Sequence, residues 1–99
     1  MKTPEAYEKD DIDEYLKEIG AYVVKPTTGG FGGSGHSDRI CCINGWFVAI
    51  EAKRPGKQPT PIQWRRIYEV QAAGGQAFWG TAKKVIAEIK EWLNRTSEA

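Results

Sequence analysis

Three charged residues, Asp38, Glu51 and Lys53, are spaced so that their side chains can meet at one place. Alternation along the apolar strand expected before Lys53 puts Glu51 and Lys53 on the same face. An Asn-Gly pair at residues 44–45 predicts a tight hairpin turn. Counting back from that turn places Asp38 opposite the Glu51 region of the partner strand. We therefore expect two carboxylates and one ammonium to converge.

Such a cluster is suited to metal-assisted hydrolysis of phosphate esters. Two carboxylates a few Å apart repel each other unless a positive charge lies between them. Mg²⁺ takes oxygen ligands and keeps waters and phosphate oxygens in its other positions, where it lowers the pKa of bound water. A nearby lysine orients that water or stabilises the negative charge that develops. The alternative is a cross-strand ion pair on a solvated sheet face.

Polar side chains also lie on the inward faces of two expected helices. Residues 4–19 predict an amphipathic helix, and its apolar stripe extends backwards through Glu8 and Glu5. A carboxylate on an inward helix face is costly unless it has a partner. Gln63 lies on the apolar face of a second expected helix, residues 60–73. Both acids of the first helix and Gln63 of the second are therefore expected to face inward.

The order of expected elements is α-β-β-β-α-β-α, an α/β fold in which helices flank a mixed sheet. Between the two helices above, strands are expected at residues 21–25, 38–43 and 46–53. A loop with five glycines at residues 27–35 precedes the second strand and is either a flexible surface loop or a glycine-lined approach to a ligand. A last strand, 76–79, leads to a helix that begins after Thr81.

Length and composition indicate one globular domain spanning residues 1–99. No apolar run approaches the roughly 18 residues of a membrane span, and the first residues do not form a secretory signal, so we expect a cytoplasmic protein. The net charge is +1, but residues 1–20 carry −4 and the remainder +5. A local basic surface is therefore compatible with the nearly neutral total. The adjacent Cys41 and Cys42 are expected to be buried free thiols.

The chain resembles the virus-type replication-repair nuclease (VRR-NUC) domains of the PD-(D/E)XK superfamily, in their stand-alone phage or bacterial form. In those domains a G-x-x-D strand, an E-x-K strand and a T-x-x-Q helix follow one another. The matching segments are Gly35-His36-Ser37-Asp38, Asn44-Gly45-Trp46-Phe47, Ile50-Glu51-Ala52-Lys53-Arg54-Pro55-Gly56, Thr60-Pro61-Ile62-Gln63 and Gly74-Gly75, with Thr3-Pro4-Glu5 at the first helix. The resemblance covers nearly the whole chain and implies a restriction-endonuclease-like core.

The resemblance also implies roles for these residues. Asp38 and Glu51 would bind Mg²⁺ or Mn²⁺, and the backbone carbonyl of Ala52 would add a ligand. Lys53 would be the catalytic lysine, and Gln63 would line the active site. Glu5 would reach the metal directly or through water. Glu8 is the alternative acid, and Glu5 is preferred because it follows Thr-Pro as in the family.

The implied activity is metal-dependent endonucleolytic hydrolysis of DNA, selective for branched DNA such as four-way (Holliday) junctions and carried out by a homodimer. A flap or nicked-duplex nuclease of the same fold and a non-catalytic DNA-binding module are the alternatives. DNA contacts are expected from five residues: Arg54, Lys57, Arg65, Arg66 and His36.

Two further groups of side chains lie on the later expected helices. Trp64 and Tyr68 lie one helical turn apart and would stack on bases, pack in the core or, the option preferred here, form a dimer contact. Lys83, Lys84 and Lys90 are expected to face solvent.

Overall fold

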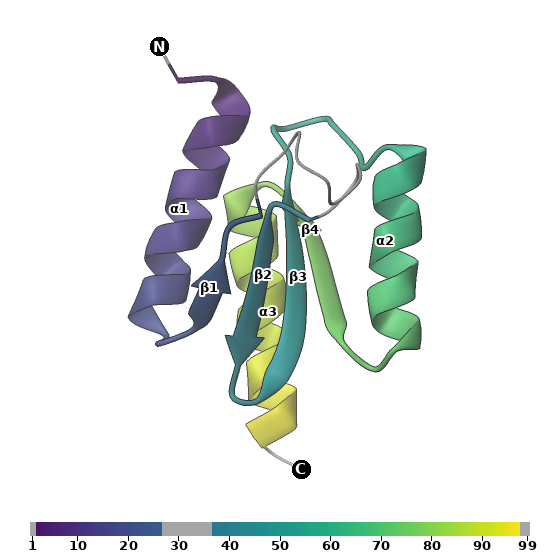
Figure 1. Cartoon of the computed structure of the whole chain (residues 1–99). Coiled ribbons are helices and arrows are strands. Elements are labelled where there is room, and N and C mark those ends of the chain that lie inside the picture. The colour runs from purple at the N-terminus through teal and green to yellow at the C-terminus, as the bar shows by residue number, and fades with distance from the viewer. Residues whose placement is uncertain (1, 27–36, 98–99) are drawn as a thin grey trace.

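The computed structural model describes residues 2–26 and 37–97, and it confirms the expected order of elements (Figure 1). The expected glycine loop, residues 27–35, and His36 lie outside the described residues. The helices and strands are α1 (Pro4–Glu18), β1 (Tyr22–Val24), β2 (Arg39–Ile43), β3 (Trp46–Ala52), α2 (Pro61–Ala72), β4 (Gln76–Gly80) and α3 (Ala82–Ser97).

The four strands form one mixed sheet in the order β1-β2-β3-β4. The first two pairings are antiparallel and the β3–β4 pairing is parallel. Asn44 and Gly45 have φ angles of 51° and 85°, the left-handed backbone that a tight hairpin turn requires. This turn fixes the pairing of Arg39 with Ile50, so Asp38 emerges beside Glu51 as the sequence predicts.

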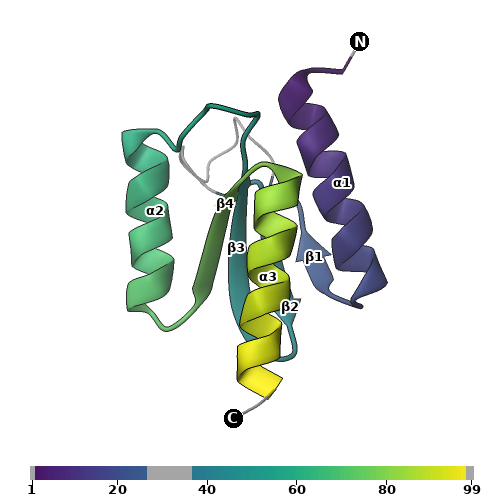
Figure 2. The same cartoon turned by 180° about the vertical axis from the view of Figure 1, so that it is seen from behind.

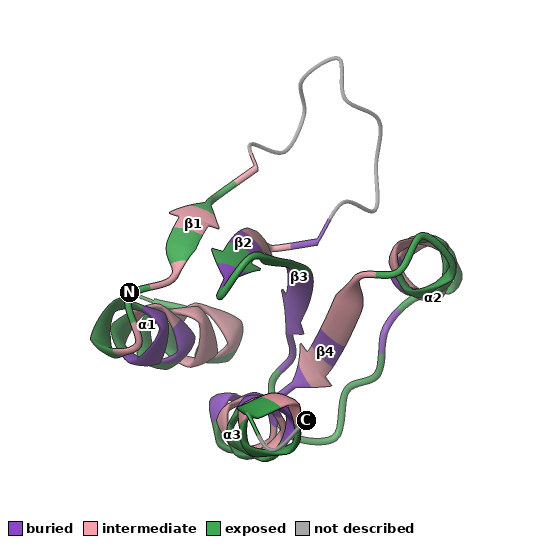
Figure 3. Ribbon diagram, turned by 90° about the horizontal axis from the view of Figure 1, so that it is seen from below, coloured by how far each residue is buried: buried purple, intermediate pink, exposed green. Residues whose placement is uncertain are grey.

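The core lies on one face of the sheet, where α1 and α3 pack side by side (Figures 2 and 3). Leu16 of α1, Val48 and Ile50 of β3, and Val85 and Ile89 of α3 are completely buried there. Burial of such side chains stabilises the fold by roughly 1.5–3 kcal/mol each. Helix α2 packs against β3 and β4 on the opposite side. That second face is less fully covered, and Tyr22 and Phe47 remain exposed.

Some details differ from the sequence-based expectations. The strands β1, β2 and β3 are each shorter than predicted by one or two residues at their ends. Cys41 is buried, and burial raises the pKa of its thiol to about 11. Cys42 is exposed, so the expectation of two buried thiols is wrong; adjacent strand residues point to opposite faces, and only one face here is fully covered. No helix in the described ranges has the length and apolar character to cross a bilayer.

Candidate active site

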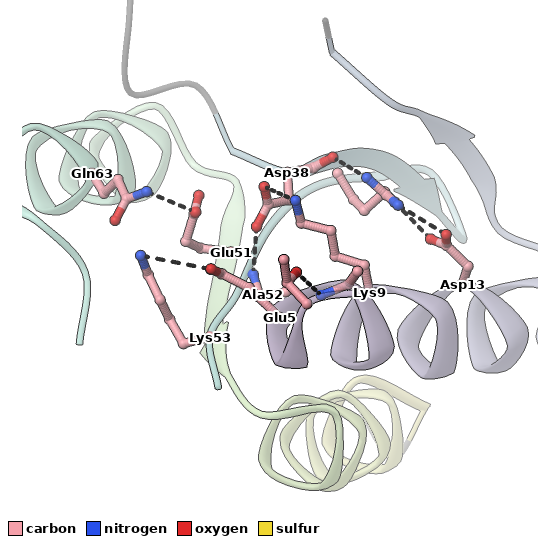
Figure 4. Close-up of polar contacts among 11 residues, drawn as sticks. Glu5, Lys9, Asp13, Asp38, Glu51, Ala52, Lys53 and Gln63 are labelled. Carbon is pink, nitrogen blue, oxygen red and sulfur yellow. Dashed lines mark hydrogen bonds and ion pairs between the residues drawn. The ribbon is translucent and has the colours of Figure 1, made fainter. Parts of the chain in front are cut away.

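Glu51, at the end of β3, is a buried carboxylate with only 4% of its surface exposed. Its Oε1 accepts a hydrogen bond of 2.8 Å from the Gln63 side-chain amide (Figure 4). Burial is the main cause that raises the pKa of Glu51 to about 8, and the adjacent Asp38 carboxylate adds to it, whereas Lys53 opposes the shift. A cation bound beside this buried carboxyl group would stabilise its ionised form.

Asp38 is fixed beside Glu51 by the backbone of the neighbouring strand. Its Oδ2 accepts a hydrogen bond of 2.8 Å from the Ala52 N–H. Its Oδ1 lies 3.3 Å from the ammonium of Lys9, on α1 (Figure 4). The two carboxylates predicted from the hairpin register are therefore brought together, and Ala52 lies between Glu51 and Lys53 at the same strand end.

Lys53 follows the last residue of β3 and is also buried, with 8% of its surface exposed. Its backbone N–H donates to the Gly80 carbonyl at 2.8 Å, which continues the β3–β4 pairing beyond the strand. Its Nζ lies 3.9 Å from Oε1 of Glu5 in the first turn of α1. A solvated cross-strand ion pair does not describe this arrangement, because both Glu51 and Lys53 are inaccessible.

The two acids of α1, Glu5 and Glu8, have different partners. Glu5 faces Lys53 and thus the predicted site. Glu8 accepts a hydrogen bond of 2.8 Å from the Ala82 N–H, at the beginning of α3. An acceptor at that position satisfies one of the helix's unpaired N–H groups. Glu8 is therefore a helix cap that joins α1 to α3.

Gln63 joins the start of α2 to the site. Thr60 and Gln63 form a capping box, in which the Thr60 N–H donates to Gln63 Oε1 at 2.8 Å. The amide nitrogen of the same side chain donates to Glu51. Both ends of the amide are used, so the cap that begins the helix also fixes the orientation of Gln63 toward the carboxylate.

A row of charged residues on α1 forms ion pairs with residues of the sheet and of its edge, which the sequence analysis did not predict. Glu5, Lys9 and Asp13 are spaced four residues apart and share one face of the helix. Lys9 contacts Asp38, and Asp13 accepts hydrogen bonds of 2.6 and 2.9 Å from Arg39 (Figure 4). Burial raises the pKa of Asp13, but the hydrogen bonds and charge of Arg39 outweigh it and leave the pKa lowered. The four-residue spacing of Glu5, Lys9 and Asp13 is the feature of the sequence that indicates a shared helix face.

The predicted DNA-contact residues lie in different settings. Arg54 and Lys57 are exposed on the turn after β3. Arg65 and Arg66 both contact Glu69, at 3.7 and 2.9 Å. Arg66 also lines an apolar cavity of about 410 Å³ between α2 and the sheet, and its buried Nε has no hydrogen-bond partner among the described residues. Among the four predicted DNA-contact residues that the structure describes, Arg54 and Lys57 are thus exposed and have no carboxylate partner, whereas both Arg65 and Arg66 pair with Glu69.

Trp64 and Tyr68 stack on the surface of α2, with ring centroids 5.9 Å apart. Trp64 also meets Trp79 of β4 edge-to-face, at 5.4 Å. Trp64 is consequently partly buried, whereas Tyr68 projects outward.

The donor set is suited to a hard divalent cation. Within residues 2–26 and 37–97, no three acid, histidine or cysteine side chains are gathered into a metal cage. Mg²⁺ does not need such a cage, because it is commonly held by one or two carboxylates and keeps waters and phosphate oxygens. Asp38 and Glu51 supply two carboxylates, and burial and the charge of Asp38 keep the pKa of Glu51 raised although Lys53 opposes the shift.

Comparison with known proteins defines the class of fold. No protein-family model matches the sequence, and no curated protein matches it. Five solved chains match the structure. One of them, a VRR_NUC domain, aligns with a TM-score of 0.78 and 23% sequence identity, over 91% of this chain and 97% of that chain. The protein therefore has the α/β fold of a VRR_NUC domain, as the resemblance predicted.

The raised pKa of Glu51 predicts how metal-free stability depends on pH. Below the ordinary pKa of 4.5 the group is protonated in both states and its stabilising contribution is complete. As pH rises toward about 8, the unfolded chain ionises first, so the stability of the folded protein falls. A loss of about 1 kcal/mol would lower Tm by about 4–8 °C. Thermal unfolding in EDTA between about pH 5 and 9 measures this.

Glu51→Gln removes the titration and should flatten the curve over this range. Glu14→Gln, on the exposed surface of α1, is the matched control and should retain the wild-type slope. The contribution of Asp13 lies at lower pH and is common to all three proteins. Parallel curves for wild type and Glu51→Gln would contradict the assigned pKa.

Proposed function

We propose that the protein is a divalent-metal-dependent DNA endonuclease that hydrolyses phosphodiester bonds. The observation that carries this proposal is the pair of adjacent carboxylates, Asp38 and Glu51, beside the buried ammonium of Lys53. The likeness to a VRR_NUC domain supports it, because that domain's name describes a nuclease. Strongly perturbed pKa values cluster at functional sites, and burial raises that of Glu51 to about 8.

In this proposal Asp38 and Glu51 bind Mg²⁺ or Mn²⁺, the Ala52 carbonyl is a further ligand, and Glu5 contributes directly or through water. The bound ion would acidify a water molecule and neutralise charge on the phosphate. Lys53 orients the attacking water and stabilises the developing negative charge. Gln63 holds the Glu51 carboxylate in one orientation through its hydrogen bond.

A polyanionic substrate agrees with the electrostatics of this end of the molecule. All three helices begin at the end of the sheet where Glu51 and Lys53 lie (Figures 1 and 2). Helix N-termini carry partial positive charge and favour phosphate groups. Arg54 and Lys57 add full charges there, while His36 and the two Glu69-paired arginines are further proposed contacts. We propose that the protein acts in the cytoplasm of a bacterial or phage-infected cell, the setting that the resemblance to stand-alone VRR-NUC domains implies.

Cleavage assays with Mg²⁺ or Mn²⁺ test the proposed chemistry. Asp38→Asn keeps an acceptor for the Ala52 N–H but removes the charge, and Lys53→Met removes the ammonium. Each should lower the cleavage rate by about 100-fold or more, the scale of losing one transition-state stabiliser. Asp11→Asn and Lys83→Met, both exposed, are the matched controls and should cleave at the wild-type rate.

Thermal unfolding of each variant confirms that the fold is retained. No cleavage by the wild-type protein, or equal rates for wild type and both site variants, would refute the nuclease proposal. A wild-type protein that binds DNA but does not cleave it would favour a non-catalytic DNA-binding module.

We further propose that the enzyme acts as a homodimer on branched DNA, because a twofold axis relates two sites to the two symmetric strands of a four-way junction. The aromatic pair on α2 supports such a contact, since Tyr68 is 60% exposed and stacked on Trp64. Exposed aromatic side chains of this kind are enriched at protein interfaces.

Sedimentation tests the proposed dimer, and substrate preference tests the proposed selectivity for junctions. The wild-type protein should sediment as a dimer at micromolar concentration and cleave a four-way junction faster than flap, nicked or linear duplex DNA. Tyr68→Glu should shift the protein toward monomer, whereas Tyr22→Glu, on the exposed β1 strand, should not. A strictly monomeric wild type would overturn the dimer, and a preference for flap or nicked DNA would overturn junction selectivity.

A further inference from the structure

A basic hollow adjoins the candidate active site at the ends of β3 and β4. It has a volume of about 240 Å³ and lies between residues 54–58 on one side and residues 79–84 on the other. Pockets for drug-sized molecules usually measure about 300–1,000 Å³. The smaller size of this hollow is suited to one charged group rather than to a whole nucleotide.

Three cations line this hollow. Arg54 and Lys57 come from the turn after β3 and are exposed, and Lys84 comes from the first turn of α3. Within the described ranges, neither Arg54 nor Lys57 forms an ion pair, so their charge is available to an anion from outside. Among the described residues, the carboxylate that pairs with Lys84 is that of Glu88, 3.3 Å away.

Lys84 is held in place, which contradicts the expectation that it simply faces solvent. Its ammonium donates a hydrogen bond of 2.6 Å to the Trp79 carbonyl and lies 3.9 Å from the centre of the Trp79 ring. Trp79 in turn packs edge-to-face against Trp64. A lysine fixed by a ring and a carbonyl loses less entropy on binding an anion than a free surface lysine does.

The backbone at Gly80 makes room for the Lys84 stem. Gly80 has a φ of 131°, and a Cβ at this position would lie 2.7 Å from Cδ of Lys84. A Cβ at this position would therefore require the Lys84 stem to shift. The sequence position of Lys84, four residues after Gly80, gave no indication of this contact.

The hollow is one strand away from the predicted metal ligands. Trp79 is the register partner of Glu51 in the parallel β3–β4 pair, and Gly80 accepts the backbone hydrogen bond of Lys53. A DNA strand that places one phosphate at Asp38 and Glu51 would therefore carry a neighbouring phosphate toward Lys84.

We propose that this hollow binds a non-scissile backbone phosphate of the DNA, held by Lys84 together with Arg54 and Lys57. The identity of the ligand rests on the proposed function, but the binding does not require cleavage. The contact is with phosphate oxygens only, so it fixes the position of the strand and carries no base preference. An ammonium has three N–H donors, and the third remains for the phosphate after Trp79 and Glu88 are satisfied.

Metal-free DNA binding tests this site separately from catalysis. Lys84→Met keeps the unbranched stem beside Gly80 and removes the charge. In EDTA, fluorescence anisotropy with labelled junction and duplex DNA should show binding weakened by about fivefold to tenfold, with the salt slope reduced by about 1. Lys83→Met, the adjacent exposed lysine, changes the net charge equally and should leave the slope unchanged.

A series of DNA probes, each with one phosphate replaced by an uncharged methylphosphonate, locates the contact. Wild type and Lys83→Met should lose affinity when a phosphate next to the cleaved one is neutral. Lys84→Met should show no further loss at that position, which is the coupling expected of a direct contact. Glu88→Gln removes the competing carboxylate and should strengthen binding by about twofold or more.

Lys57→Met, at the exposed side of the hollow, provides a second variant with the same expectation if Lys84→Met unfolds. Undiminished methylphosphonate sensitivity in both variants would overturn the site, as would an absence of DNA binding by wild type. Binding that follows the expected pattern without any cleavage in Mg²⁺ would refute the nuclease and leave the phosphate site standing.

Discussion

The arrangement of this protein depends on the cost of burying one carboxyl group, Glu51. An ionised carboxylate that is removed from water is unstable unless charge or hydrogen bonds compensate it. Here the hydrogen bond from Gln63 and the nearby Lys53 compensate only in part, because the pKa remains raised to about 8. The remaining deficit is a charge that a divalent cation would supply. The raised pKa thus connects the folding of the strand end to the chemistry proposed for it.

Helix α1 is held against the sheet by two kinds of interaction that serve different purposes. Ile12 and Leu16 are buried in the core and supply most of the free energy of docking. The Lys9–Asp38 and Asp13–Arg39 pairs lie at the edge of that contact. Partly exposed ion pairs add little stability, but they set the position of a helix precisely enough to place Glu5 beside Lys53. The site therefore depends on the packing of α1.

Features that the sequence predicted correctly come from local rules. The Asn-Gly turn fixed the strand register, alternation placed Glu51 with Lys53, and the Thr60–Gln63 spacing marked the beginning of α2. Each of these follows from residues close together in the chain. Gln63 is predicted to face inward for the same reason, because its spacing from the apolar residues of its own helix is local.

Features that the sequence did not predict involve partners far apart in the chain. Glu8 caps a helix 74 residues away, and Arg39 pairs with Asp13 across 26 residues. The sequence does not distinguish Lys84 from an exposed lysine, because its contacts with Gly80 and Trp79 arise only when α3 packs beside β4. Such contacts depend on how α1, β4 and α3 pack, which charge and periodicity alone do not determine. The pairs of Arg65 and Arg66 with Glu69 are an exception, because Glu69 lies four and three residues away on the same helix, a spacing that the sequence does show.

Location of the bound metal tests the central claim most directly. Crystals of the protein grown with Mn²⁺ should give an anomalous-scattering peak between the carboxylates of Asp38 and Glu51, with Mn–oxygen distances of about 2.0–2.3 Å. Crystals of Asp38→Asn, grown in the same way, should lack the peak. A Mn²⁺ ion bound elsewhere, or an unliganded Asp38–Glu51 pair at saturating Mn²⁺, would contradict the account.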